Sequence, residues 1–322
     1  MKEILVDKNE SDQRLDRFLK KYLANAPQTF IYKMIRKKNI KVNDGRSQPE
    51  TTIFEGDKIQ LYLSDETIDK FTLKKTEIKS KLIPNIIYED NNIILINKPA
   101  GVLSHGASKE FEENIVDSMI SYLIQKGDFV PRIEKTFTPS ICNRLDRNTS
   151  GIIIGAKNYQ SLKAINEAIK NGHIRRFYKT IVKGNVKEEK REEGYLIKDE
   201  DKNKVEIYKD DIEGSKKVTT HIKPLQNKNG YSMLEIELIT GRTHQIRGHL
   251  ASLGYPVIGD RKYGDRKTNM TFNEGAGLDN QLLHAYKVEF NGLSEEFKYL
   301  NGRTFISELM GMSADVAKEL FN

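Results

Sequence analysis

Apolar residues recur at helical spacing near the start of the chain and then alternate with polar residues over short runs. A first helix is predicted from four apolar residues that share one face, with Ser11 as the candidate cap: Leu15, Phe18, Leu19 and Tyr22. A second helix is predicted over residues 29–38, with three apolar residues on its buried face: Ile31, Met34 and Ile35. Strands are predicted at residues 40–42 and 58–63, and the turn Asn43-Asp44-Gly45 follows the first.

A different pattern follows. Residues 86–99 predict two short strands around an acidic turn, and the segments 178–182 and 234–238 alternate as half-buried strands do, with one face in water. Between them lies a predicted helix with Asn158 as its cap and Gly172 as its stop. Strands separated by occasional helices, without regular alternation, favour an α+β fold with a mixed sheet over a doubly wound one.

Three polar segments interrupt these elements. Residues 64–82 have the lysine-rich, apolar-poor composition of a linker, residues 186–213 predict a charged, exposed excursion between strands, and residues 268–279 predict a mobile loop. The predicted organisation is therefore a small domain, residues 1–63, and a large domain, residues 83–322, on either side of that linker.

The composition narrows the class of protein. With 37% hydrophobic and 31% charged residues, one cysteine and no apolar run near the roughly 20 residues of a membrane helix, the chain is expected to be cytoplasmic. The net charge is +7, and residues 1–82 hold 18 Lys or Arg against 13 Asp or Glu. A basic N-terminal region suits a polyanionic partner, although a lysine-rich surface also serves solubility alone.

The segment from Asn143 to Gly151 carries the first candidate chemistry. It sets Asp146 between Arg144 and Arg147 at a turn, and guanidinium neighbours favour the ionised carboxylate. Such a group serves as a nucleophile or an electrostatic stabiliser. The alternative is a structural turn held by arginines. Gly151 allows backbone angles that a side chain would forbid.

A second candidate lies on a helix predicted to begin near Thr243. Arg247 would lie near the edge of its buried face and reach a carboxylate across a cleft in a bidentate pair, unless it is simply a solvated helix arginine. His244 and His249 are five residues apart, without the arrangement of a zinc site, so we predict no metal and a structural or RNA-contacting role for them.

These segments resemble the signature blocks of the RluA-type pseudouridine synthases, most of all the RluC- and RluD-like branch that modifies large ribosomal RNA. The block HRLDxxTSG corresponds to NRLDRNTSG at residues 143–151, with Asn143 in place of histidine, and GRTHQIRxHL begins at Gly241. Further blocks match at residues 176–184 and 282–285. The resemblance implies a mixed, largely antiparallel bent sheet flanked by helices. It also implies conversion of specific uridines to pseudouridine in large-subunit ribosomal RNA, without a cofactor.

The resemblance also implies roles for single residues. Asp146 would be the catalytic nucleophile, Arg247 its partner, and Tyr178 the residue stacked on the target uracil. Leu283 would line the base pocket. Arg144 would fill the stack that the flipped base leaves.

The N-terminal unit resembles a small RNA-binding domain shared by a ribosomal protein, tyrosyl-tRNA synthetases and many RNA-modifying enzymes, through residues 14–16, 35–44 and 56–57. Its second helix carries Lys33, Arg36 and Lys37 on one face, which predicts RNA contact, although such a face is often only solvated. Arg242 and His244 are the candidate RNA contacts of the large domain.

Several alternatives remain at this stage. A transfer-RNA pseudouridine synthase would share the catalytic blocks, and a binding-only ribosome-assembly factor would share the fold. A methyltransferase lacks support because no glycine-rich loop lies between a predicted strand and helix. A serine hydrolase built on Ser104 and His105 lacks the usual elbow motif. The sequence leaves the oligomeric state and the modified uridines open.

Overall fold

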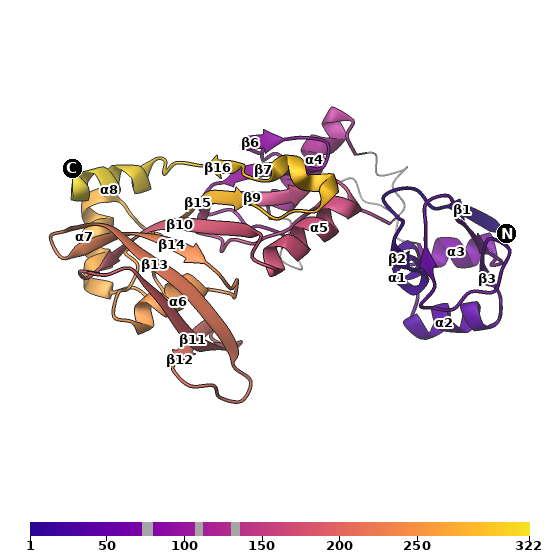
Figure 1. Ribbon diagram of the computed structural model, residues 1–322, viewed down its shortest axis with the longest axis horizontal. Helices are drawn as coiled ribbons and strands as arrows, with labels where there is room; N and C mark the ends of the chain where they lie inside the picture. Colours follow the sequence, from indigo (N-terminus) through magenta and orange to yellow (C-terminus); the bar gives the residue numbers. More distant parts are fainter. Residues whose placement is uncertain (73–79, 107–111, 130–135) are drawn as a thin grey trace.

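The computed structural model describes residues 1–72, 80–106, 112–129 and 136–322. At the N-terminus, helices pack on a sheet of strand order β1-β5-β3 and a strand pair β2-β4 (Figure 1). The elements there are β1 (Lys2–Leu5), β2 (Gln13–Arg14), α1 (Leu15–Tyr22), α2 (Gln28–Arg36), β3 (Ile40–Val42), β4 (Thr52–Ile53), β5 (Lys58–Leu61) and α3 (Asp65–Phe71).

The predicted elements of this small unit are present. The apolar faces of α1 and α2 form one core with β3 and β5, and the turn after β3 has positive φ at Asn43 and Asp44. The prediction that Ser11 caps α1 is wrong. Arg14 occupies the cap position, because residues 13 and 14 first pair as a strand with Ile53 and Thr52.

The predicted linker begins with a helix instead. Ser64 caps α3 by accepting a hydrogen bond from the backbone N–H of Thr67 at 3.3 Å. Ile68 is buried in the core of the small unit, and Phe71 lies against Phe30 with ring centroids 4.7 Å apart. A helix of two turns needs few apolar residues to pack. The lysine-rich composition of residues 64–82 therefore did not indicate this helix. Residues 73–79 of the predicted linker lie outside the described part of the chain.

The rest of the chain forms a large sheet of order β12-β11-β13-β14-β10-β15-β9-β7-β6, with β16 on β15 and β8 on β9. Every pairing is antiparallel except the one between β9 and β15, which confirms the predicted mixed, largely antiparallel sheet. The strands are β6 (Ile86–Glu89), β7 (Ile93–Lys98), β8 (Ser140–Ile141), β9 (Ser150–Ala156), β10 (Ile174–Lys183), β11 (Lys190–Asp199), β12 (Lys204–Tyr208), β13 (Lys216–Lys228), β14 (Tyr231–Leu238), β15 (Leu283–Phe290) and β16 (Thr304–Ile306).

Helices cover both faces of this sheet, as Figure 1 shows for α4, α5 and α6. The helices are α4 (Ile115–Lys126), α5 (Tyr159–Lys170), α6 (Gln245–Ser252), α7 (Arg266–Ala276), the 3-10 helix η1 (Glu295–Leu300) and α8 (Met312–Phe321). Ile94 and Ile96 of β7 pack in a core with α4 and α6, whereas Ile93 and Leu95 pack with α5. Central strands are apolar throughout because both of their sides are buried.

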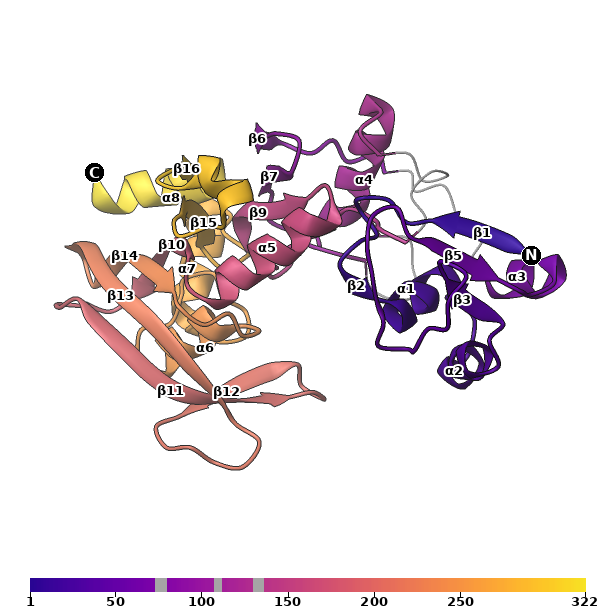
Figure 2. The same ribbon diagram turned by 45° about the vertical axis from the view of Figure 1, so that its right-hand side comes forward.

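Two further predictions about strands need correction. The face of residues 178–182 predicted to be wet is largely covered: Lys179 is 24% exposed, but Ile181 on the same side is buried in a core with α8 residues such as Val316 and Phe321. Residues 186–213, predicted to be a charged, exposed excursion between strands, do project from the sheet, but they contain two further strands, β11 and β12, which extend it at one edge (Figures 1 and 2). Leu196 and Val205 bury the inner side of this hairpin. The many charges on its outer side hid that period-two pattern.

The predicted loop 268–279 is also mostly helical. Asp265 caps α7 by accepting a hydrogen bond from the backbone N–H of Thr268 at 2.9 Å, and Gly277 ends the helix in the left-handed conformation. Gly275 within the segment disfavours a helix, which is why the sequence predicted a loop. The predicted boundaries of α5 are confirmed: Asn158 caps the helix, and Gly172 follows its end with a positive φ.

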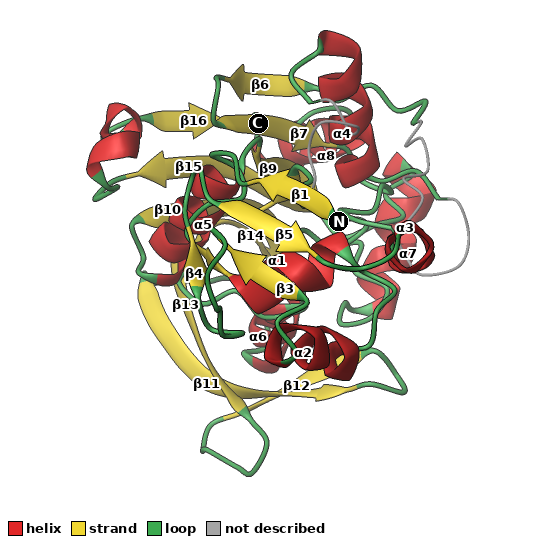
Figure 3. Cartoon of the chain, turned by 90° about the vertical axis from the view of Figure 1, so that its right-hand side faces the viewer, coloured by secondary structure: helices red, strands yellow, loops and turns green. Residues whose placement is uncertain are grey.

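The small unit lies at one end of the large one (Figure 1), in front of it in the view of Figure 3, and meets it through polar contacts. Lys163 of α5 forms an ion pair with Asp12, and the Lys21 ammonium lies 5.2 Å from the centre of the Tyr159 ring. Lys163 and Asp12 are both more than half exposed, so this contact stabilises the arrangement only weakly.

Candidate active site around Asp146

Asp146 lies in a turn that the neighbouring strand holds in place. The backbone N–H of Thr149 donates to the carbonyl of Asp146 at 3.0 Å, and β9 begins at the next residue. Asn143, buried before the turn, donates from Nδ2 to the carbonyl of Ile152 at 3.2 Å and accepts from the N–H of Ile154 at 2.8 Å. The asparagine side chain therefore ties the motif to β9.

Two buried side chains hold the turn from the interior. The Lys98 ammonium donates to the carbonyl oxygens of Pro99, Val102 and Arg147 at 2.7 to 2.9 Å. Burial lowers the pKa of Lys98 to about 7, while three carbonyl acceptors use all three N–H donors of the protonated form. Ser104 donates to the carbonyl of Leu145 at 2.7 Å and accepts from its N–H at 3.0 Å, a structural role and not that of a nucleophile.

Gly151 allows the strands around the turn to meet. Its φ is +111°, and a Cβ there would lie 2.2 Å from the carbonyl oxygen of Ala285, so no side chain fits. Ala285 pairs with Gly151 on one side and with Tyr178 on the other. Tyr178, Leu145 and Leu283 consequently pack in one buried cluster next to the Asp146 turn.

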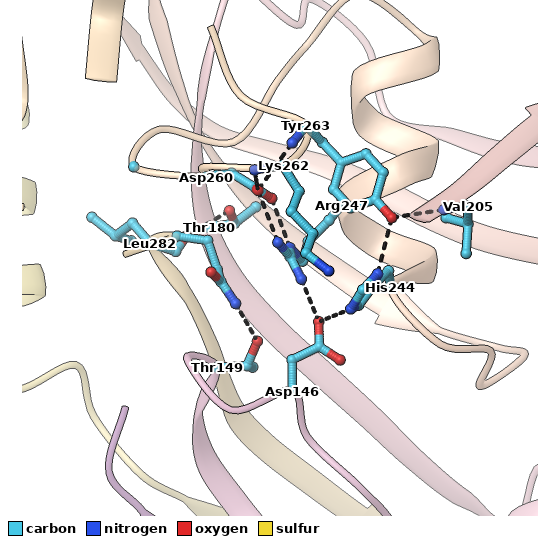
Figure 4. A network of polar contacts seen from close by, with 12 residues as sticks. Asp146, Thr149, Thr180, Val205, His244, Arg247, Asp260, Lys262, Tyr263 and Leu282 are labelled. Carbon is cyan, nitrogen blue, oxygen red and sulfur yellow. Dashed lines mark hydrogen bonds and ion pairs between the residues drawn. The ribbon is translucent and has the colours of Figure 1, made fainter. Parts of the chain in front are cut away.

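The predicted pairing of Asp146 with Arg247 is present, but with a different geometry (Figure 4). Arg247 Nη1 donates to Asp146 Oδ2 at 2.8 Å through a single hydrogen bond. The bidentate partner is Asp260, whose two oxygens accept from Arg247 Nε at 2.7 Å and Nη2 at 2.8 Å. Arg247 is buried and not at the edge of the helix face.

The arginines next to Asp146 in the sequence do not hold it. Arg147 pairs with Glu112, and Arg144 is exposed without an ion pair to any described residue. The cation at Asp146 comes from a residue about a hundred positions later, which the turn itself could not indicate.

Burial decreases from Asp260 to Asp146. The side chains of Asp260, Arg247 and Asp146 are 0%, 6% and 25% exposed. Burial opposes the charge of Arg247, but hydrogen bonds and charge from Asp260 and then Asp146 raise the pKa of the guanidinium. Burial likewise opposes the charge of Asp260, and Arg247 holds the pKa of that carboxyl below its usual value. The arrangement therefore presents a fixed cation to one oxygen of Asp146, and Oδ1 accepts no hydrogen bond from a described residue.

His244 faces the same oxygen of Asp146. Its Nε2 lies 3.9 Å from Asp146 Oδ2, and its Nδ1 lies 2.9 Å from the hydroxyl of Tyr263. That hydroxyl accepts from the N–H of Val205 at 2.8 Å, so its proton is free to bond Nδ1 and leave the histidine proton on Nε2. Burial lowers the pKa of His244, which favours this neutral form.

Tyr178 remains protonated near neutral pH. Burial raises the pKa of the phenol, the charge of Arg176 lowers it, and the charge of Asp146 raises it. The buried ring is a flat, uncharged surface beside the carboxylate.

The remaining predicted site residues are more distant or more exposed. Arg242 is exposed in the loop before α6, while Lys33, Arg36 and Lys37 lie on the exposed side of α2 in the small unit. The structure thus leaves the α2 cations apart from the Asp146 site. The predicted residues that it brings together are Asp146, Tyr178, His244, Arg247 and Leu283. Sequence reasoning gave no role to Asp260, Tyr263 or Lys98, although a lysine that ends an apolar strand is an available signal.

Neither a metal centre nor a membrane helix is found in the described ranges. No group of three or more His, Cys, Asp or Glu side chains is placed to hold a metal ion in these parts of the chain. Over the same residues, no helix combines the length and apolar character needed to cross a membrane.

We predict that stability falls as the pH drops below about 6.5. His284 is buried, with Nε2 2.7 Å from the carbonyl of Ser307 and Nδ1 2.8 Å from the Ser150 hydroxyl, and burial lowers its pKa. Because the folded-state pKa is below that of the unfolded chain, the unfolded state binds more protons as the pH falls. Melting temperatures between pH 7.5 and 5 measure this, and the slope should be shallower in His284→Gln. His173→Gln, at an exposed site, is the control, and equal slopes in both variants would contradict the assignment.

Comparison with known proteins agrees with this geometry. A model of the RNA pseudouridylate synthase family matches residues 92–252. Ribosomal large subunit pseudouridine synthase C of Buchnera aphidicola is 32% identical over 289 residues, which cover 89% of this chain and 88% of that protein. The protein of the same name from Escherichia coli is 29% identical over 90% of this chain and 88% of its own. An uncharacterized RNA pseudouridine synthase of Mycoplasma capricolum is 31% identical, covering 95% and 97%.

Solved structures show the same fold. Human RNA pseudouridylate synthase domain containing 4 superimposes with a TM-score of 0.57 at 19% identity, covering 73% of this chain and 92% of that one. The matched family region spans half of the chain and includes both Asp146 and Arg247. The chain therefore belongs to the RNA pseudouridylate synthase family and is an RNA pseudouridine synthase.

Proposed function

We propose that this enzyme converts specific uridines of large-subunit ribosomal RNA to pseudouridine, and so acts in the cytoplasm. Relatives with that substrate in their name align over nearly their whole length, which supports ribosomal over transfer RNA. The observation that carries the catalytic proposal is the carboxylate of Asp146, with one oxygen held by Arg247 and the other unbonded among the described residues.

The reaction is an isomerisation that consumes no second reagent. The bond from the ribose C1′ to N1 of uracil breaks, a bond from C1′ to C5 forms, C5 loses its proton and N1 gains one. We assign to Asp146 Oδ1 the attack at the sugar, either on C1′ or on a sugar proton, and to Arg247 the positioning of the carboxylate through its bond to Oδ2. This chemistry requires neither a metal nor a redox cofactor.

The detached uracil must rotate without leaving the site. We propose that Tyr178 stacks on one face of the uracil and that Leu283 contacts the other; both residues are buried next to the turn. The target nucleotide must first leave its stack, which costs a few kcal/mol. Arg144, exposed beside Asp146, has a planar side chain that suits the vacated position.

The small unit is proposed as a second RNA-binding surface. Three exposed cations of α2 and its C-cap supply this surface: Lys33, Arg36 and Lys37. Arg242 and His244 are proposed as RNA contacts nearer the active site. Because α3 packs into the small core, we place the end of this domain after residue 72 and not at residue 63.

Neutralising Lys33, Arg36 and Lys37 together to Gln should weaken RNA binding and lower the dependence of log K on log salt by about 2 to 3, since each phosphate contact releases counterions. The side chains are exposed, so the fold should be retained. Titrations of an rRNA fragment at several salt concentrations measure the slope. The double variant Lys298→Gln/Lys318→Gln is the charge control, and an equal change in both variants would remove α2 from the RNA surface.

The test of the overall function is a pseudouridine map of large-subunit rRNA and tRNA from cells with and without the gene. We expect a few rRNA sites to disappear and to return with the wild-type protein but not with Asp146→Asn. Loss of tRNA sites instead would transfer the proposal to transfer RNA. Return of the rRNA sites with Asp146→Asn would refute the catalytic assignment alone.

A further inference from the structure

Arg176 of β10 is a buried cation without a counter-charge among the described residues. The residue is 9% exposed, and its Nε–H has no hydrogen-bond partner in this part of the chain. Its one described hydrogen bond runs from Nη2 to the carbonyl of Leu238 at 3.4 Å, a long contact with a neutral group. No described carboxylate pairs with it.

The preceding residue, Arg175, has the carboxylate partners that Arg176 lacks among the described residues. Arg175 donates from Nε and Nη2 to Glu237 at 2.7 and 2.8 Å, and from Nη1 to Glu289 at 3.1 Å. Arg175 is nearly half exposed and yet has two carboxylate partners, whereas the buried Arg176 has none in the ranges that the structure describes. A buried, uncompensated guanidinium is unfavourable, so a site that keeps one is expected to receive an anion.

Arg176 faces the active site. Residues two apart on a strand point to the same side, so Arg176 shares a face with Tyr178. Tyr178 packs with Leu145 and Leu283 next to the Asp146 turn, so Arg176 lies on the side of the sheet that carries this turn.

An exposed glycine lies against the guanidinium. A Cβ built on Gly241 would lie 3.2 Å from Arg176 Nη1, and Gly241 is itself exposed. The loop that leads to His244 and Arg247 thus covers this cation with the one residue type that has no side chain. An anion that enters along this loop meets the unsatisfied donors of Arg176.

We propose that Arg176 binds the phosphodiester next to the uridine that is isomerised. The inference rests on the proposed function, in which a flipped nucleotide enters the pocket beside Tyr178 and brings its flanking phosphates with it. A planar guanidinium with free N–H donors matches phosphate oxygens well. Arg176 would then be an RNA-binding residue that fixes the nucleotide, distinct from the residues that act on the glycosidic bond.

The test combines two variants with a modified substrate. Arg176→Gln should lower kcat/KM by about 10- to 100-fold, the size of a lost charge-assisted hydrogen bond, while Arg175→Gln is the matched control. Synthetic RNA substrates carry one uncharged methylphosphonate, either 5′ or 3′ to the target uridine. At one of these positions the wild type should lose a similar factor, and Arg176→Gln should lose little more.

The outcomes separate this proposal from the function on which it rests. If the wild type forms no pseudouridine in the unmodified RNA, the proposed substrate is wrong. If it does, and each methylphosphonate affects Arg176→Gln as much as the wild type, the phosphate assignment is wrong. Should Arg176→Gln fail to fold, Gly241→Ala replaces it: a methyl group 3.2 Å from Nη1 should weaken the methylphosphonate effect, and an unchanged effect overturns the proposal.

Discussion

Asp146→Asn is expected to abolish pseudouridine formation, with a rate loss of at least about 10⁴-fold, as for removal of a nucleophile in other enzymes. Asparagine keeps the shape of the side chain but lacks the anionic oxygen that acts at the sugar. Stability should change by less than about 1 kcal/mol, because Asp146 is partly exposed and Arg247 keeps its two bonds to Asp260. RNA affinity should be retained, because the substitution leaves the fold and the proposed RNA contacts in place.

Release of tritium from uridine labelled at C5 measures this activity directly, since C5 loses its hydrogen in the reaction. RNA affinity and the melting temperature are measured on the same preparation. Asp279→Asn, at an exposed carboxylate that pairs with Arg261, is the control and should retain full activity. Tritium release by Asp146→Asn within about tenfold of the wild type would assign the chemistry to another group.

Arg247→Met should lose both activity and stability. The substitution leaves the fully buried Asp260 without the two hydrogen bonds that hold its pKa low, and breaking a buried pair in this way costs about 3 to 5 kcal/mol. It also removes the cation from Asp146. The contrast with Asp146→Asn, which should lose activity alone, separates the structural and catalytic tasks of this arginine.

Urea unfolding at pH 7 gives the free energy of unfolding of each variant. Arg261→Met is the matched control, because Arg261 also pairs with an aspartate but is 71% exposed, so the loss there should stay below about 1 kcal/mol. Equal losses in the two variants would mean that the Asp260 pair does not stabilise the fold. Restored stability without activity in Arg247→Met/Asp260→Leu would support the division of tasks.

Periodicity was sufficient where apolar residues stand between clear cap or turn signals. The helix between Asn158 and Gly172 and the two strands around residue 90 are where the pattern placed them. It failed where few apolar residues do the packing: α3 needs only Ile68 and Phe71, and β11 and β12 bury only small patches under many charges. The wet face predicted for β10 is covered by α8, an element more than a hundred residues later that local patterning does not include.

In the site too, the sequence identified single residues better than the contacts between distant segments. The family resemblance paired Asp146 with Arg247, as the structure has it, whereas the residues next to Asp146 on their own pointed to Arg144 and Arg147. That Arg247 divides its donors between two carboxylates depends on the loop that brings Asp260 under α6. Lys98 was given no role because the backbone carbonyls that it bonds cannot be identified from the sequence, although its position at the end of an apolar strand was a signal.

The interior bonds of Lys98, Ser104 and Asn143 fix the shape of the Asp146 turn before any RNA arrives. An enzyme whose reactive group is already set leaves adaptation to the other molecule, so the RNA must deform to fit. Uridines in bulges, loops and weakly stacked helices yield easily, and those in long regular duplexes do not. Selection among the many uridines of a folded RNA therefore depends first on how easily the RNA around each uridine deforms.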